Sequence, residues 1–162
     1  MSSVEKTDEL NVTIRAMNET DLQRIVELER ELFSDPWSET AFREALAEDD
    51  WGMLAAQVGE EIVGYACYVI IDVESHLTNL AVAEPFRRKS VAKRLLEHIL
   101  RVVREAPCQY LLLEVRPSNT GAVAFYRKHG FHHMYRRPRY YRNPVEDALV
   151  MAYHFDETRD DG

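Results

Sequence analysis

Residues 79–92 read NLAVAEPFRRKSVA and join the end of a strand to the start of a helix through a basic turn. The strand is expected to end at Val82, the turn carries Pro85, and the helix opens within the run 87–92. A helix N-terminus offers unpaired N–H groups and the positive end of the helix dipole, which disfavours cations unless an anion binds there. The basic residues therefore favour an anion site suited to a pyrophosphate, and a merely solvated basic loop is the alternative.

The hydrophobic pattern on either side of this stretch predicts one α/β domain. The expected elements before it are a strand 12–17, a helix after Asn18, a helix capped by Ser38, a hairpin 51–58 and 62–71, and a strand 74–82. Those after it are a helix 91–103, a strand 110–115, a helix 120–129 ended by Gly130, and two strands, 131–141 and 148–155. The order β-α-α-β-β-β-α-β-α-β-β indicates a mixed, mostly antiparallel sheet with helices on both faces.

Two of the predicted helices have a clear apolar side. Their expected core residues are Leu22, Ile25, Val26, Leu28, Leu32 and Phe33 in the first, and Ala92, Leu95, Leu96, Ile99, Val102 and Val103 in the other. Residues 11–155 are predicted to form the domain, with 1–10 and 156–162 as flexible tails.

Composition excludes several classes of protein. The chain has 162 residues, 46% of them hydrophobic, which is enough for a core without disulfides. Its 28 acidic and 20 basic side chains give a net charge of −8, which argues against nucleic acid as a partner. Cys67 and Cys108 have no CxxC spacing, and no apolar leader or membrane-length segment occurs, so we expect a cytoplasmic protein without a membrane partner.

Histidines and arginines suggest two further kinds of site. The six histidines include the adjacent pair His132 and His133 on a predicted strand, but no metal-ligand spacing occurs, so no metal is predicted. The basic and aromatic run 136–142 could contact single-stranded RNA. The run is short and the rest of the chain is acidic, which argues against this RNA interpretation.

The basic turn and the C-terminal half together resemble a known family. The run Arg87 to Ala92 is similar to the acetyl-CoA signature of the GNAT superfamily, Arg/Gln-x-x-Gly-x-Gly/Ala, with Ser90 where the family has glycine. The segments LLLEVRPSN (111–119), AVAFY (122–126) and KHGF (128–131) resemble the strand–helix–strand end of GNAT enzymes. With DPWS (35–38), RYY (139–141) and EDA (146–148), the resemblance narrows to the bacterial ribosomal-protein N-terminal alanine acetyltransferases, or RimI-like enzymes.

This resemblance implies a GNAT fold and an N-acetyltransferase that uses acetyl-CoA as acetyl donor. The implied acceptor is the N-terminal α-amine, of alanine, of a small-subunit ribosomal protein, attacking acetyl-CoA directly in a ternary complex. One alternative is an acetyltransferase for a small-molecule amine or a lysine side chain. Another is a non-catalytic GNAT-like binding module, because Ser90 departs from the phosphate-loop glycine.

The resemblance also implies roles for individual residues. Glu114 is the expected general base and Tyr126 the general acid. The expected acetyl-CoA contacts are the backbone of Leu80, Ala81 and Val82, the phosphate loop Arg87, Arg88, Lys89, Ser90, Val91, Ala92 and Lys93, and the side chain of Asn119. Trp37, Tyr140 and Tyr141 are expected at the acceptor cleft. A carboxylate suits this chemistry because a free α-amine, with a pKa of about 7.7–8.0, is largely protonated at neutral pH.

Each of these residues also has a purely structural interpretation. Alternation places Glu114 with Leu112 and Arg116, so it could mark the point where its strand reaches solvent, with Arg116 keeping it ionised. Tyr126 lies on an amphipathic helix, where an aromatic residue usually packs. Trp37 could equally belong to the core between two helices.

Overall fold

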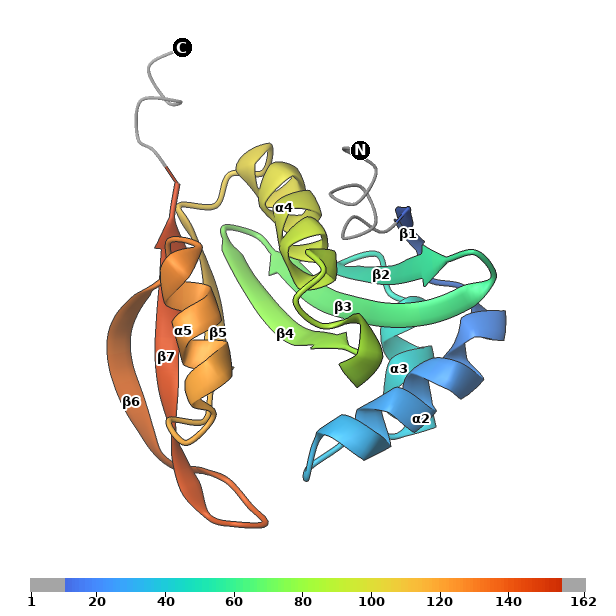
Figure 1. The fold of residues 1–162 in the computed structure, drawn as a ribbon. Helices are drawn as coiled ribbons and strands as arrows, with labels where there is room; N and C mark the ends of the chain where they lie inside the picture. The colour runs from blue at the N-terminus through green and yellow to red at the C-terminus, as the bar shows by residue number, and fades with distance from the viewer. Residues whose placement is uncertain (1–10, 156–162) are drawn as a thin grey trace, which may run out of the picture.

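The computed structural model describes residues 11–155, which form four α-helices and one seven-stranded sheet (Figure 1). The strands are β1 (Val12–Ala16), β2 (Trp51–Val58), β3 (Glu61–Ile71), β4 (Glu74–Val82), β5 (Tyr110–Val115), β6 (His132–Tyr141) and β7 (Glu146–His154). The helices are α2 (Leu22–Leu32), α3 (Glu39–Leu46), α4 (Val91–Arg104) and α5 (Thr120–Lys128), with 3-10 turns η1 (Glu19–Asp21) and η2 (Glu84–Phe86). The predicted element order is confirmed, and the predicted tails lie outside the described residues.

The sheet has a gap in its middle. Its strand order is β1-β2-β3-β4-β5-β7-β6, and every neighbouring pair is antiparallel except β4 and β5. These two parallel strands pair only at Ser75–Leu111 and His76–Leu112, and then diverge (Figure 1). Beyond His76, the edge of β4 that faces β5 therefore has no partner strand. Peptide groups of a strand alternate between its two edges, so part of the backbone of residues 77–82 is open toward this gap.

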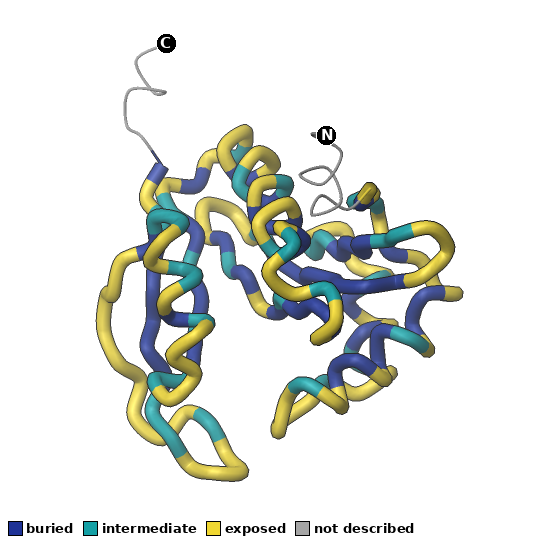
Figure 2. Tube along the Cα trace, in the orientation of Figure 1, coloured by how far each residue is buried: buried dark blue, intermediate teal, exposed yellow. Residues whose placement is uncertain are grey.

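Apolar cores fill both faces of the sheet, as Figure 2 shows by the buried strands between exposed helix surfaces. On one face α4 and α5 cover β5 and its neighbours, with Leu95, Ile99, Leu111 and Leu113 buried. On the other face α2 and α3 cover β2 and β3. The predicted mixed sheet with helices on both faces is confirmed. Within residues 11–155, no helix combines the length and apolarity needed to cross a bilayer.

The cap of α3 and the glycine that ends α5 are found where the sequence predicted them, whereas two residues predicted for the core are not buried. Ser38 caps α3 through Ala41 N–H at 3.1 Å, and Gly130, at φ 99°, follows α5 in a conformation that favours glycine. Phe33, predicted for the core, lies beyond the end of α2 in an extended conformation and is 36% exposed. Val102 was also predicted for the core, but it is 38% exposed because it lies at the edge of the buried stripe of α4.

A β-bulge changes the direction of side chains in β4. Cys67 of β3 pairs with Asn79 and Tyr68 pairs with Leu77, so Thr78 is an extra residue on β4. Its hydroxyl donates a hydrogen bond to the Cys67 carbonyl at 3.0 Å. The bulge breaks the simple alternation of β4. As a result Leu77 packs on the α4 side of the sheet, whereas Ala81 packs on the α2 side.

Candidate active site

The first cavity lies at the N-terminal end of α4 and has a volume of about 810 Å³. Of the eleven residues predicted to hold the cofactor, ten line this cavity, and Lys89 does not. Tyr126 and eight residues that were not predicted for the site complete it: Leu32, Phe33, Phe86, Gly121, Ala122, Phe125, Lys128 and His129. This volume is typical of a site for a large organic ligand. We call it the donor cavity.

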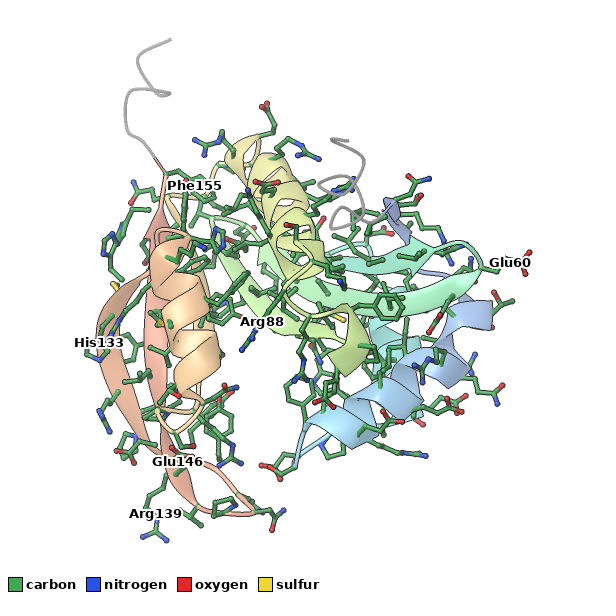
Figure 3. The ribbon with its side chains drawn as sticks, viewed as in Figure 1. Glu60, Arg88, His133, Arg139, Glu146 and Phe155 are labelled. Carbon is green, nitrogen blue, oxygen red and sulfur yellow. The ribbon has the colours of Figure 1, made fainter. Side chains whose placement is uncertain are left out.

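The loop before α4 presents backbone donors and cations to the donor cavity. Arg94 N–H donates to the Ser90 carbonyl at 3.0 Å, so the N–H groups of residues 91–93 precede the first helical hydrogen bond. The Ser90 side chain does not cap them. Arg88 lies beside this end of α4, toward α5 (Figure 3). Free N–H groups, the helix dipole and the guanidinium groups together fit a pyrophosphate.

Two residues of this loop have left-handed backbone conformations. Arg88 has φ 63° and Ser90 has φ 68°. Such a conformation places the Cβ of a non-glycine residue close to the backbone and is unfavourable by about 1–2 kcal/mol. The glycine that the family signature has at this position would carry no such strain. The substitution at Ser90 therefore acts on the backbone as well as on the space left for phosphate.

We expect Ser90→Gly to raise the free energy of unfolding by about 0.5–1 kcal/mol, because it relieves the positive φ at some cost in chain entropy. We also expect acetyl-CoA to bind about five-fold more tightly, since phosphate can then approach the backbone. Thermal unfolding and calorimetry measure the two effects. Arg88→Gly is the matched control: it relieves the same strain but removes a cation, so it should stabilise the fold and weaken binding. Weaker binding by Ser90→Gly would instead assign a hydrogen bond to the serine hydroxyl.

The second cavity lies on the other side of the gap between β4 and β5 and has a volume of about 570 Å³. Its walls come from α2, the loop 33–37, β4, β5 and the hairpin of β6 and β7. The predicted acceptor residues Trp37, Tyr140 and Tyr141 all line it, and so does Glu114. We call it the acceptor cavity.

The two cavities meet. Five residues line both of them: Phe33, Leu80, Asn119, Ala122 and Tyr126. A donor group in one cavity and an acceptor group in the other can therefore come together next to Leu80 and Tyr126. Asn119 serves a structural purpose at this junction as well, because its Oδ1 accepts from Ala122 N–H at 3.1 Å and caps α5. Donation to a ligand would come from its Nδ2 group.

Glu114 points from β5 into the acceptor cavity. Alternation along β5 buries Leu111, Leu113 and Val115 on one face and leaves Glu114 on the other, as predicted. Its carboxylate lies 3.5 Å from the Arg137 guanidinium, and the side chain is 17% exposed. The expected partner, Arg116, does not pair with it. Burial, together with the negative charge of Glu114, raises the pKa of Tyr140 and of Tyr141, so both phenols stay neutral beside it.

Tyr126 lies on α5 at the junction of the cavities. Its ring packs against Phe125 and Phe131, with centroids 5.4 Å away in each case. Burial raises the pKa of the Tyr126 phenol well above its usual range. The group therefore keeps its proton at neutral pH and can donate it. Packing and proton donation, which the sequence left as alternatives, are compatible here.

Arg116 links the two segments that border the acceptor cavity, the loop after α2 and the hairpin of β6 and β7. It donates to Glu146 at 3.1 Å and to Asp35 at 3.2 Å, and it stacks 4.4 Å above the Tyr141 ring. Asp35 in turn accepts from the backbone N–H of Arg142 at 3.1 Å. Glu146 marks the start of β7 near the hairpin (Figure 3). The loop after α2 is thereby fixed to the hairpin, because this geometry engages both carboxylates with one guanidinium.

Several residues of the acceptor cavity were missed from the sequence. Glu29 and Asn79 line it, as do Phe33, Asp35 and Arg142. A signal existed for Glu29, since it falls seven residues after Leu22 within the apolar stripe of α2, where a charge is unusual. Trp37, whose two interpretations stayed open, lines the cavity and also packs against Phe42 and Trp51. Among residues 11–155, no group of three or more His, Cys, Asp or Glu is placed to hold a metal ion.

A donor cavity whose basic loop and helix N-terminus fit a pyrophosphate, joined to an acceptor cavity that contains a carboxylate, suits a group-transfer enzyme. Comparison with known proteins identifies the group that is transferred. The model of the acetyltransferase (GNAT) family matches residues 22–131. The chain belongs to this family and is an acetyl-CoA-dependent N-acetyltransferase.

Relatives of known name match nearly the whole chain. The N-alpha-acetyltransferase RimI of Mycobacterium tuberculosis is 35% identical over 86% of this chain and 90% of its own length. The [ribosomal protein bS18]-alanine N-acetyltransferase of Escherichia coli K12 is 32% identical over 86% of this chain and 95% of its own. The crystal structure of the E. coli ribosomal-protein-S18-alanine N-acetyltransferase superposes with a TM-score of 0.80 at 29% identity, over 88% of this chain and 93% of that one.

Proposed function

We propose that this enzyme acetylates the N-terminal α-amine of a protein, and that the acceptor is the alanine of a small ribosomal subunit protein of the bS18 type. The observation that carries the proposal is the junction of the two cavities, with Glu114 on the acceptor side and Tyr126 between them. The names of relatives that are 32–35% identical over most of the chain support the choice of acceptor. Such an acceptor is made in the cytoplasm, where we infer that the enzyme acts.

In the proposed mechanism acetyl-CoA and the acceptor bind together. The residues of the loop before α4 and the N-terminal N–H groups of α4 bind the pyrophosphate, the backbone of residues 80–82 holds the pantetheine arm, and Asn119 donates a hydrogen bond to acetyl-CoA. The backbone N–H groups of residues 80–82 that face the gap polarise the thioester carbonyl, as in an oxyanion hole. Glu114 takes the proton of the α-ammonium, directly or through water, and the amine attacks the carbonyl carbon. The C–N bond forms, the C–S bond breaks, and Tyr126 gives its proton to the leaving sulfur. The nitrogen loses its remaining extra proton, which restores the Tyr126 phenol, and Glu114 releases its proton to solvent.

The border of the acceptor cavity favours a chain terminus over a side chain in the middle of a peptide. Arg116 and Asp35 hold the loop after α2 against the hairpin of β6 and β7. The N-terminus of a chain can enter such an opening with its α-amine first. A lysine in mid-chain would bring a peptide strand on each side of it against this border.

Mass spectrometry of acetylated peptides tests the proposal. The panel holds peptides beginning with Ala, Ser and Met, an N-terminally blocked peptide with one lysine, and small amines such as spermidine. We expect acetyl transfer to the α-amine of the Ala peptide and none to the blocked peptide. Acetylation of lysine or of the small amines alone would identify a different acceptor, and the absence of acetyl-CoA binding would leave a non-catalytic module.

A further inference from the structure

A buried carboxylate forms part of the floor of the acceptor cavity. Glu29 lies on the core-facing side of α2 and is 2% exposed. Its Oε1 accepts from the Tyr65 hydroxyl at 2.6 Å, and its Oε2 accepts from the Trp37 backbone N–H at 3.0 Å. Asn79 Nδ2 lies 3.4 Å from each oxygen. All of these donors are neutral.

The charge of Glu29 is not balanced by a cation. None of the ion pairs found within residues 11–155 includes it. Burial and the nearby Glu29 charge raise the pKa of the Tyr65 phenol and of the Cys67 thiol, so both groups remain neutral next to the carboxylate. A buried carboxylate is unfavourable unless it is paired with a cation or fully hydrogen-bonded. Its place in the wall of a cavity means that the cation could come from a ligand.

Asn79 supplies a second observation that points to a ligand. Asn79 is 6% exposed and lines the acceptor cavity, and its Oδ1 is a buried acceptor without a partner among the described residues. The carboxylate fixes the orientation of the amide, because Nδ2 must face Glu29 to avoid placing acceptor against acceptor. Oδ1 is therefore available to a donor. The β-bulge at Thr78 puts this side chain on the α2 side of the sheet.

The two groups share a chemical preference. A carboxylate with no cation and an amide oxygen with no donor both attract a group that carries a positive charge and N–H donors. An α-ammonium has both properties, with three N–H bonds and one unit of charge. Glu114 lines the same cavity, so the cavity that would hold the ammonium also contains a proton acceptor.

We propose that Glu29 and Asn79 form the docking site for the α-ammonium of the acceptor. This inference rests on the proposed function, whose acceptor is an N-terminal amine. Asn79 Oδ1 accepts one N–H, and the Glu29 carboxylate supplies the counter-charge that draws the protonated amine into the cavity. Glu114 then removes a proton and releases the amine for attack. The binding of the ammonium and its deprotonation are thereby divided between two carboxylates.

The test compares two peptides in four proteins: wild type, Glu29→Gln, Asn79→Ala and Tyr65→Phe. One peptide begins with alanine, and the other has the same sequence with a propionyl group, which lacks the amine, in place of the alanyl group. Calorimetry with saturating CoA at a pH of about 6.5 keeps the amine protonated. We expect the wild type to prefer the ammonium peptide by about 10- to 100-fold, the range of a hydrogen bond to a charged group. Glu29→Gln should remove most of this preference, and Asn79→Ala part of it.

Tyr65→Phe is the matched control, because it removes a hydrogen bond to the same carboxylate without changing the charge. It should lower stability and keep the preference. If Glu29→Gln and Asn79→Ala weaken both peptides equally, Glu29 only holds the Trp37 loop and the inference is wrong, while the proposed function stands. The same holds if the wild type acetylates the Ala peptide but binds both peptides equally. A wild type that binds and acetylates neither peptide overturns the proposed function itself.

Discussion

Replacing Glu114 with glutamine should lower kcat by about 10²- to 10⁴-fold, the usual contribution of a general base. Glutamine keeps the shape of the side chain on β5 but cannot take a proton from the ammonium. Binding of acetyl-CoA should stay unchanged, because Glu114 lines the acceptor cavity and not the donor cavity. Steady-state kinetics with the Ala peptide, together with calorimetry of acetyl-CoA, measures both quantities.

A pH profile separates catalysis by Glu114 from a structural effect. Above a pH of about 8 most of the α-amine is already deprotonated, so the difference in kcat between the wild type and Glu114→Gln should narrow as the pH rises. A distorted strand would give a deficit that does not depend on pH. Asp147→Asn is a suitable control, because Asp147 contacts Arg136 and the Arg139 backbone on the same hairpin but does not line either cavity. A Glu114→Gln enzyme as active as the wild type would exclude Glu114 as the base.

Most of the fold could be predicted because its signals are local. The bounds of β2, β4 and β5 agree residue for residue with the sequence-based ranges. These strands end at turns that the sequence marks with glycine, proline or charged residues. The end of α5 at Gly130 could also be predicted from the sequence, since a helix end that needs a positive φ favours glycine. Phe33 was placed wrongly because periodicity continues past Leu32, whereas the helix ends there.

The donor side of the site was more predictable than the acceptor side. The eleven residues predicted to hold the cofactor lie in two short segments and one cap, which a sequence motif captures, and ten of them line the donor cavity. The acceptor side depends on contacts between distant parts of the chain. Glu29 meets Tyr65 36 residues later and Asn79 50 residues later. The partner of Glu114 is Arg137 on β6 and not Arg116, because Arg116 is occupied by Asp35 and Glu146. The bulge that orients Asn79 has no signature in the sequence.

The second large effect is expected at Tyr126. Tyr126→Phe should lower kcat by about 10²-fold, since the leaving thiolate then departs without a proton donor. The ring packing against Phe125 and Phe131 is kept, so the free energy of unfolding should change little. Tyr153→Phe is the matched control: Tyr153 packs against the same Phe131 ring, with centroids 5.7 Å apart, but it does not line either cavity. Its kcat should remain near that of the wild type.

The raised pKa of Tyr126 also determines how kcat should change at alkaline pH. A tyrosine of ordinary pKa, about 10, would be half ionised at that pH and would lose half of its capacity as an acid. Because burial disfavours the charged form, the Tyr126 phenol should stay protonated there, and kcat should show no decline as the pH rises to about 10. The Tyr126 phenol likewise makes its full contribution to the free energy of unfolding below a pH of about 10, the pKa of tyrosine in the unfolded chain. This contribution is lost only as the pH rises further. A decline of wild-type kcat near pH 9 that is absent in Tyr126→Phe would contradict a buried, protonated acid.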